Sequence, residues 1–190
     1  MKKPSIGFEW SYRDLLFTLM TAFMAMSVMA LIITTKAQET KSINQGNILI
    51  ELYWDINVVA DVDLWIQAPN ETPVGYSRKS GKTFNLLRDD LGKGKDTESR
   101  NQEIVVGRGL KEGEYIVNAH QFASIDGLPI ECKIIVRLNR DDFSNIIATE
   151  KVTLTYNGDE KTVLRFSLDE NGNVIPDSFN KVYKNLSGIQ

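Results

Sequence analysis

The sequence contains few of the residues that carry most protein chemistry. Among its 190 residues there is one cysteine, Cys132, and one histidine, His120. A lone cysteine excludes an intramolecular disulfide, and the two residues supply neither a zinc ligand set nor a catalytic triad. The sequence also has no phosphate-binding loop, dinucleotide-binding fingerprint or nucleophile elbow. We therefore predict that the protein is not an enzyme and that Cys132 and His120 have structural roles.

Charged residues are spread along the chain except in one stretch. The formal net charge is −3, the pI is near 5.3, and no block rich in lysine and arginine with interleaved aromatic residues occurs. This composition does not indicate a nucleic-acid partner. Residues 15–33 contain no Asp, Glu, Lys, Arg or His. The mean hydropathy of −0.22 therefore averages a very apolar beginning and a polar remainder.

The uncharged stretch 15–33 is long enough to cross a lipid bilayer. At a rise of about 1.5 Å per residue, a helix over this stretch is roughly 28 Å long, close to the thickness of the hydrocarbon core. A buried core helix would be amphipathic or shorter, and a signal peptide would have a shorter apolar core. We predict a transmembrane helix at 15–35, between a cytoplasmic N-terminus at 1–14 and a polar linker at 36–46.

The orientation of this span is inferred from the segments on its two sides. Three basic residues precede it, and Lys36 and Lys41 follow it, so the positive-inside bias is slight. The short N-terminus and the long remainder favour a bacterial inner-membrane protein with its N-terminus in the cytoplasm and its larger part in the periplasm. Trp10 and Tyr12 suit the cytoplasmic interface, where amphipathic rings settle.

An acid, Asp14, stands directly before the apolar stretch. It could be an ordinary boundary residue that caps the helix N-terminus, alone or together with Ser11. Alternatively, helical spacing places Asp14 on one stripe with Thr18, Thr21 and smaller residues beyond them. Hydroxyl groups gain nothing from lipid, so this stripe favours contact with a neighbouring helix or a hydrated channel. The residues alone leave both interpretations open.

The segment YRDLLFTLMTAFMAM at 12–26 resembles the start of the single span of flagellar stator B subunits (MotB) and of their relatives ExbD, TolR and the Zorya-defence B subunit. In those families a tyrosine, a small residue and an essential aspartate open the helix, which Ser11-Tyr12-Arg13-Asp14 resembles. Arg13 replaces the small residue, and Thr18 lies four residues after the acid instead of the usual three. The peptidoglycan-binding domain that usually ends MotB-type and Zorya-type B subunits has no counterpart here.

This resemblance implies the B subunit of a proton-driven rotary motor. Asp14 would carry the proton, while Thr18, Thr21 and Tyr12 would line a channel or contact a neighbouring helix. The partners would be a second copy of the chain and a pentameric ring of a multi-span subunit of the MotA, ExbB or TolQ kind. In its neutral form Asp14 can enter a dry contact, whereas in its charged form it needs water or a polar partner.

From Asn47 onward the pattern is that of β-strands. Short runs of β-branched and aromatic residues alternate with Gly and Asp turns, and Asn157-Gly158 is a strong hairpin signal. The predicted fold class is a single N-terminal transmembrane helix followed by an all-β sandwich of roughly eight strands at 47–168. A polar tail at 169–190 is expected to pack loosely or to run along the surface.

A second resemblance lies within the β region. The segments DVDLW at 61–65, DD at 89–90, NQE at 101–103 and GEYIVNAHQF at 113–122 are similar to bacterial secreted β-sandwich domains of the YfaP type. Proteins with such domains are mostly uncharacterised or resemble carbohydrate-binding modules. The resemblance therefore implies a fold and a glycan as a candidate partner. Because the peptidoglycan-binding domain has no counterpart, the sandwich could instead bind another envelope protein or a second copy of the chain.

The aspartates of this pattern allow two interpretations. The carboxylates of Asp61, Asp63, Asp89 and Asp90 could gather around Ca²⁺, a hard cation that takes six to eight oxygen ligands. Alternatively, they cap turns and accept hydrogen bonds from backbone N–H groups, and no EF-hand loop is present. We predict no obligatory cofactor and keep Ca²⁺ as a candidate. Trp65 could stack on a sugar, or it could belong to the core.

Two functions are consistent with these observations. The first is the B subunit of a proton-driven inner-membrane rotary motor, in which Asp14 carries the proton and the periplasmic sandwich anchors the complex or transmits force. The alternative is a membrane-tethered β-sandwich binding module for a glycan or an envelope protein, in which Asp14 is merely interfacial. A motor subunit requires a multi-span partner, whereas a tethered binder should keep its function when its span is replaced by a neutral one.

Overall fold

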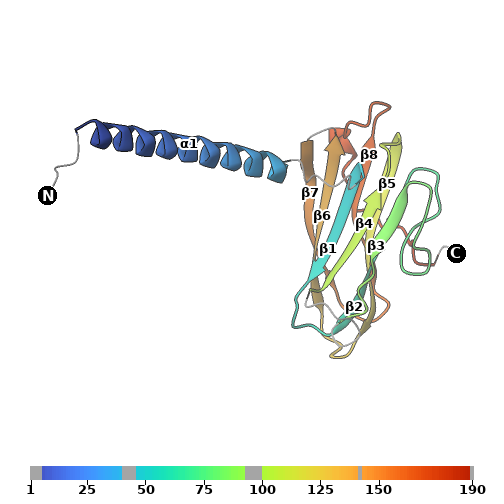
Figure 1. Ribbon diagram of the computed structural model, residues 1–190. Helices are drawn as coiled ribbons and strands as arrows, with labels where there is room; N and C mark the ends of the chain where they lie inside the picture. The colour runs from blue at the N-terminus through green and yellow to red at the C-terminus, as the bar shows by residue number, and fades with distance from the viewer. Residues whose placement is uncertain (1–5, 40–45, 93–99, 141–142, 189–190) are drawn as a thin grey trace. The chain divides into compact units, whose positions relative to one another are not determined.

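The computed structural model describes residues 6–39, 46–92, 100–140 and 143–188 of the chain. They belong to two compact units, residues 1–44 and residues 45–190, and each is considered by itself. The first unit contains one apolar helix, and the second is a mostly β domain with two antiparallel sheets (Figure 1).

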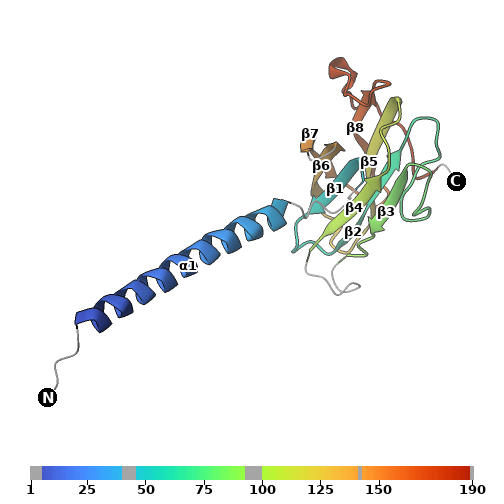
Figure 2. The same ribbon diagram turned by 45° about the horizontal axis from the view of Figure 1, so that its top comes forward.

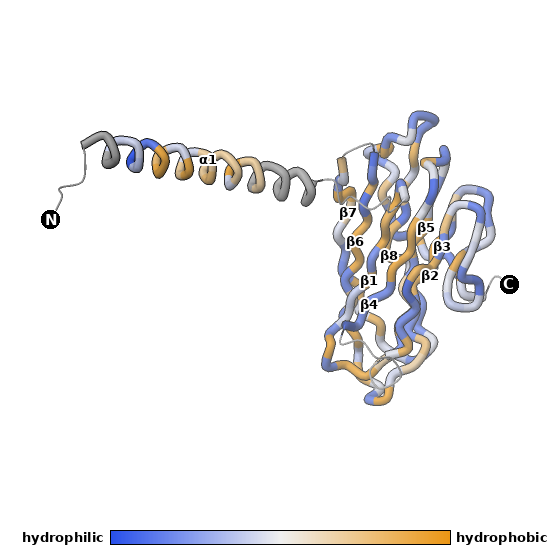
Figure 3. The backbone as a smooth tube through the Cα atoms, in the orientation of Figure 1, coloured by the Kyte–Doolittle hydropathy of each residue, from blue (hydrophilic) through white to orange (hydrophobic). Residues whose placement is uncertain are grey.

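The helix α1 (Ile6–Glu39) is longer than the sequence predicted at both ends. Its segment Trp10–Ala30 is long and apolar enough to cross a membrane, and none of that segment is buried. Figure 3 shows that the apolar residues follow a polar beginning. Lys, Ala, Gln and Glu after Ile33 are good helix formers, so the helix continues through 36–39, the start of the predicted linker. Residues 40–45, the rest of that linker except Gly46, lie outside the described residues.

In its described residues the second unit contains eight strands, the first beginning at Ile48 and the last ending at Leu168. The larger sheet has the order β3-β4-β1-β6-β7, and the smaller has the order β2-β5-β8. Figures 1 and 2 show the two sheets as layers. The strands are β1 (Ile48–Trp54), β2 (Ala60–Gln67), β3 (Phe84–Arg88), β4 (Gln102–Gly107), β5 (Gly113–Ser124), β6 (Ile130–Arg140), β7 (Phe143–Leu154) and β8 (Glu160–Leu168).

Alternating apolar residues create the core between the sheets. In β1, Ile48, Ile50 and Leu52 point inward and are fully buried, because successive side chains of a strand point to opposite faces. Strand β2 supplies the facing layer, in which Leu64 and its neighbours two residues away are also fully buried. Cys132 of β6 belongs to this core, as predicted, and burial raises the pKa of its thiol to about 12.

The C-terminal tail covers the outer face of the smaller sheet. Asn180 exchanges two backbone hydrogen bonds with Arg165 of β8, and a short 3-10 helix, η1 (Pro176–Ser178), precedes it. Further on, Leu186 is buried against Trp65 and Ile116. The tail therefore runs along the surface, which is one of the two arrangements expected from the sequence. Leu186 completes a second, small apolar core there with Trp65 and Ile116.

Candidate functional site

Asp14 lies inside α1 and not at its N-terminus. Because the helix begins at Ile6, neither Asp14 nor Ser11 can serve as its N-cap, and the capping interpretation is wrong. Asp14 and Tyr12 are exposed on the helix surface. The neighbouring Arg13 guanidinium lies 5.7 Å from the centre of the Trp10 ring, within cation–π range.

The hydroxyl groups of the predicted stripe find acceptors on their own helix. The Thr18 hydroxyl donates to the backbone carbonyl of Asp14. The Thr21 hydroxyl lies 3.0 Å from the carbonyl oxygen of Phe17 and 2.9 Å from that of Thr18. These bonds satisfy both hydroxyls without a neighbour. The channel-lining roles of Thr18, Thr21 and Tyr12 therefore stay predictions.

In the sandwich, three acids from separate elements meet at one place. Asp63 of β2, Asp89 directly after β3, and Glu103 of β4 each place one carboxylate oxygen within 4.8 Å of the others. Because β2 and β4 belong to different sheets, this carboxylate cluster joins the two layers. Two of its members, Asp63 and Asp89, are among the four aspartates predicted to gather.

Glu103 is the most enclosed member of the carboxylate cluster, with none of its surface exposed. Its Oε2 accepts a hydrogen bond of 2.6 Å from the backbone N–H of Leu64, and its Oε1 accepts one of 3.4 Å from that of Asp90. Burial, together with the charge of Asp63, raises the pKa of Glu103 well above its ordinary value. Burial likewise raises the pKa of Asp63.

Two nitrogen atoms contact the cluster, and the ammonium group of Lys79 balances part of its charge. The Nδ1 atom of His120 lies 2.9 Å from Oδ2 of Asp63, and the Nζ atom of Lys79 lies 2.6 Å from Oδ2 of Asp89. The other carboxylate oxygen of Asp89 is buried and has no hydrogen-bond partner among the described residues. His120 thus contacts an acid of the cluster, and its structural role stays a prediction.

The single positive charge of Lys79 does not balance three carboxylates this close. Either a proton neutralises one of them, as the raised pKa of Glu103 favours, or a cation binds among them. A hard divalent cation such as Ca²⁺ is the metal that this all-oxygen donor set fits. Asp63, Asp89 and Glu103 are the described residues that could hold it.

The other two predicted calcium ligands lie outside this group. Asp90 accepts backbone hydrogen bonds of 2.9 Å from Gln102 and 3.0 Å from Gly92, and it pairs with Arg88 at 3.2 Å. It therefore braces the loop, as the second interpretation of the aspartates stated. Asp61 is buried on β2 but is not one of the three grouped carboxylates.

The sequence prediction missed Glu103 as a candidate ligand. A signal was present, because a glutamate in a strand whose other residues are mostly apolar requires a special environment. It was also the last residue of the NQE segment on which the second resemblance was based.

Trp65 does not offer a stacking surface. Only 1% of its surface is exposed, and Gly75 lies so close that a Cβ there would be 2.4 Å from the ring. The Tyr76 ring packs edge-on at 5.6 Å between centres. The ring therefore belongs to the core, which is the second of the two interpretations that the sequence left open for it.

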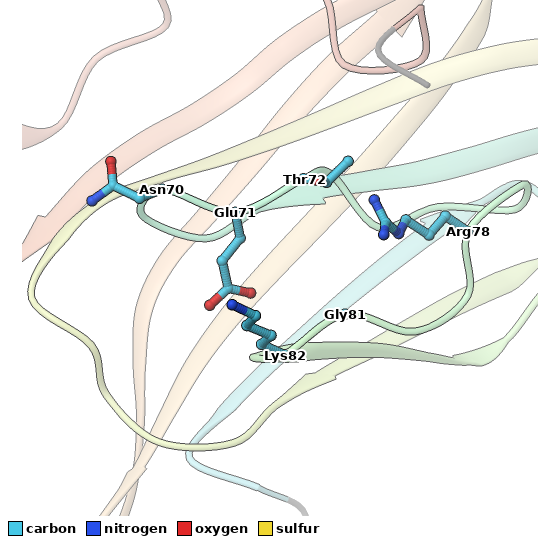
Figure 4. A pocket seen from close by; sticks show the side chains of 6 residues that line it. All are labelled: Asn70, Glu71, Thr72, Arg78, Gly81 and Lys82. Carbon is cyan, nitrogen blue, oxygen red and sulfur yellow. The ribbon is translucent and has the colours of Figure 1, made fainter.

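A surface hollow near the start of the β2–β3 connection contains acidic and basic side chains (Figure 4). Its carboxylate, Glu71, accepts hydrogen bonds of 2.7 Å and 3.0 Å from the hydroxyl and backbone N–H of Thr83, and Lys111 lies 3.5 Å away. Although burial raises the pKa of Glu71, these partners more than offset that effect and lower it. The contacts of Glu71 therefore hold the two ends of the β2–β3 connection together.

Comparisons with protein-family models, with curated proteins and with solved structures found no match for this chain.

Proposed function

We propose that this chain is the single-span subunit of a proton-driven complex in a bacterial inner membrane, with Asp14 as the proton-carrying group. The observation on which this rests is the composition of α1. Between residues 10 and 30, Arg13 and Asp14 are the charged residues, and every side chain of this segment is exposed in the isolated helix.

Such a helix requires surroundings from outside the chain. Its exposed Leu, Met and Phe side chains need lipid or other helices, because apolar surface is unfavourable in water. A charged carboxylate at the edge of the hydrocarbon needs water or a polar partner. Ionisable residues within membrane spans commonly mark ion pathways. A multi-span ring around two copies of α1 would provide both environments.

The energy of proton transfer is sufficient for such a role. One elementary charge that crosses 100 mV releases about 2.3 kcal/mol, which biases a step more than tenfold. Neutral and charged Asp14 would favour different contacts with the ring, so alternate protonation from the two sides would drive motion. The sandwich, placed in the periplasm, would anchor the complex or transmit its force.

The test is proton flux through the complex purified by means of this chain and reconstituted in vesicles. We expect Asp14→Asn to abolish flux while the multi-span partner still co-purifies. Asp14→Glu should keep part of the flux, and Arg13→Gln serves as the adjacent-charge control. Full flux through Asp14→Asn would overturn the proposal.

A second candidate function is favoured by the carboxylate cluster. A membrane-tethered binding module would use the sandwich, in which Asp63, Asp89 and Glu103 could hold a cation that braces the domain. In that case Asp14 is interfacial, and a chain whose residues 14–33 are replaced by a neutral apolar span keeps its function.

A further inference from the structure

A surface hollow lies where the C-terminal tail passes the β7–β8 turn and the start of β8. Its volume is about 500 Å³, within the range of roughly 300–1,000 Å³ that small-molecule sites have. Two tyrosines line it, Tyr156 of the turn and Tyr183 of the tail. Tyr156 is 62% exposed and Tyr183 is 56% exposed. We call the space that these two side chains line the tyrosine hollow.

The turn that carries Tyr156 is held in place by a buried acid. Oδ2 of Asp159 accepts hydrogen bonds of 2.7 Å from the backbone N–H and of 2.9 Å from the hydroxyl of Thr155. The backbone N–H of Asp159 donates to the carbonyl oxygen of Tyr156 at 2.9 Å, and that of Gly158 donates to Gln121 of β5 at 2.7 Å. The exposed Tyr156 therefore lies on a turn whose backbone is fixed to the sheet.

The tail segment that carries Tyr183 is fixed as well. The backbone N–H of Lys184 donates to the Thr162 hydroxyl at 3.0 Å, and its carbonyl oxygen accepts a bond of 2.7 Å from Nδ2 of Asn118. Leu186, two residues further on, is buried. Because both sides of the tyrosine hollow are held by the fold, little binding energy is lost in ordering them around a ligand.

The charges around the tyrosine hollow are paired. Its lining residues include two lysines, Lys161 and Lys181, and two acids, Asp159 and Glu160. Each lysine has a carboxylate beside it, because Lys161 lies 3.3 Å from Asp159 and Lys181 lies 2.7 Å from Glu150. An anion therefore meets lysines that already have carboxylate partners, and a cation meets two ammonium groups. Neither kind of charged ligand is favoured.

The tyrosine hollow can nevertheless donate hydrogen bonds. An ammonium group has three N–H bonds. Among the described residues, that of Lys181 donates to Glu150, and that of Lys161 contacts Asp159 and the carbonyl oxygen of Thr153. Both ammonium groups therefore keep at least one N–H for a ligand, and both lysine side chains are at least 40% exposed.

Tyr183 adds a neutral phenol to these donors. Partial burial, together with the nearby negative charge of Glu160, raises the pKa of Tyr183 above its ordinary value. The phenol therefore keeps its proton at neutral pH and stays a hydrogen-bond donor as well as an acceptor.

We propose that the tyrosine hollow binds a neutral saccharide. A sugar ring has an apolar face of C–H groups, which stacks on an exposed aromatic ring, and hydroxyl groups, which accept hydrogen bonds from ammonium and phenol groups. Two exposed tyrosines and two lysines around one hollow provide both interactions. The proposal deepens the proposed function and rests on it, because it names what the periplasmic sandwich holds when it anchors the complex.

The test uses the full chain in a zwitterionic detergent that has no sugar headgroup. Short neutral oligosaccharides of glucose, galactose, mannose and N-acetylglucosamine are titrated against it in a calorimeter. At least one is expected to bind with a dissociation constant below about 1 mM. Tyr156→Ala and Tyr183→Ala should each weaken this binding at least tenfold, and Tyr183→Phe, which keeps the ring, should weaken it less. Phe143→Ala, which removes an exposed ring at the start of β7, is the matched control and should bind as the wild type does.

Binding of none of these saccharides at that level would overturn the inference, and so would equal binding by the wild type and the two alanine variants. Displacement of the bound saccharide by inorganic phosphate would overturn it too, because the site would then prefer an anion. The two proposals fail separately. Loss of flux in Asp14→Asn without saccharide binding keeps the proton-carrying role and removes the saccharide site. Saccharide binding together with full flux in Asp14→Asn does the reverse.

Discussion

Glu103 and Asp14 are acids in two very different environments of the same chain. Glu103 is enclosed by the sandwich itself, which supplies its backbone donors and the neighbouring carboxylates that raise its pKa. Asp14 is exposed on a helix that buries none of its apolar surface. The sandwich itself therefore supplies the surroundings of Glu103, whereas the Asp14 side chain stays exposed on the described part of its helix.

The same contrast applies to apolar residues. The difference between Leu64 and Leu19 is the largest effect on the free energy of unfolding that we expect. Leu64 is fully buried in the sandwich core, and Leu64→Ala should lower its free energy of unfolding by about 2–5 kcal/mol. Leu19 is 60% exposed on α1, so Leu19→Ala should change that free energy by less than about 0.5 kcal/mol. Denaturant unfolding of the full chain in detergent, followed by tryptophan fluorescence, measures both. An equal loss in Leu19→Ala would show that the two units are not energetically independent.

The carboxylate cluster should give the next largest effect, as a dependence of stability on pH. Because the pKa of Glu103 is higher in the folded than in the unfolded chain, the folded protein holds this proton more tightly. Stability is therefore lost as pH rises from about 4.3, the unfolded glutamate value, toward the folded pKa. We expect Glu103→Gln to flatten this loss, and to leave the sandwich more stable than the wild type at any pH above the folded pKa of Glu103.

The control for this measurement is Glu131→Gln, which changes an exposed glutamate paired with Lys151. It should leave the pH profile unaltered. The slope that remains in Glu103→Gln is attributed to Asp63, whose pKa is also raised by burial. A profile that Glu103→Gln leaves as steep as in the wild type would contradict the assignment of the proton to Glu103.

Calcium addition tests whether a cation can replace the proton held by Glu103. At pH 8, Ca²⁺ at ten times its dissociation constant should stabilise the wild-type sandwich by about 1.4 kcal/mol, visible as a rise in Tm. Glu103→Gln should lose this rise, because it removes one of three charged oxygen ligands. Equal Tm values of the wild type in Ca²⁺ and in chelator would dismiss Ca²⁺ as an occupant of the cluster.

The strands, the core and the apolar helix were readable from the sequence because each depends on local periodicity. Alternation in residues such as Ile48 and Ile50 identified β1, and the uncharged stretch 15–33 identified most of α1. The carboxylate cluster was only half predicted, because it depends on which strands of different sheets lie beside each other. For the same reason the sequence left open whether Trp65 is buried, since Gly75, Tyr76 and Leu186 reach it from other segments.

Thr18 gives the smallest expected effect and refines the comparison within α1 itself. Its hydroxyl already donates to the carbonyl oxygen of Asp14, so it needs no group from outside the helix, and valine has nearly the same shape. We therefore expect Thr18→Val to change proton flux in reconstituted vesicles by less than about threefold, a barrier change below about 0.7 kcal/mol. Thr21→Val is the matched variant one turn further on, with a hydroxyl that is also bonded within the helix. Thr18→Val could instead abolish flux as completely as Asp14→Asn. The Thr18 hydroxyl would then have to leave its backbone acceptor and contact the ion path. In that case the proposed role would belong to two side chains of α1 instead of one.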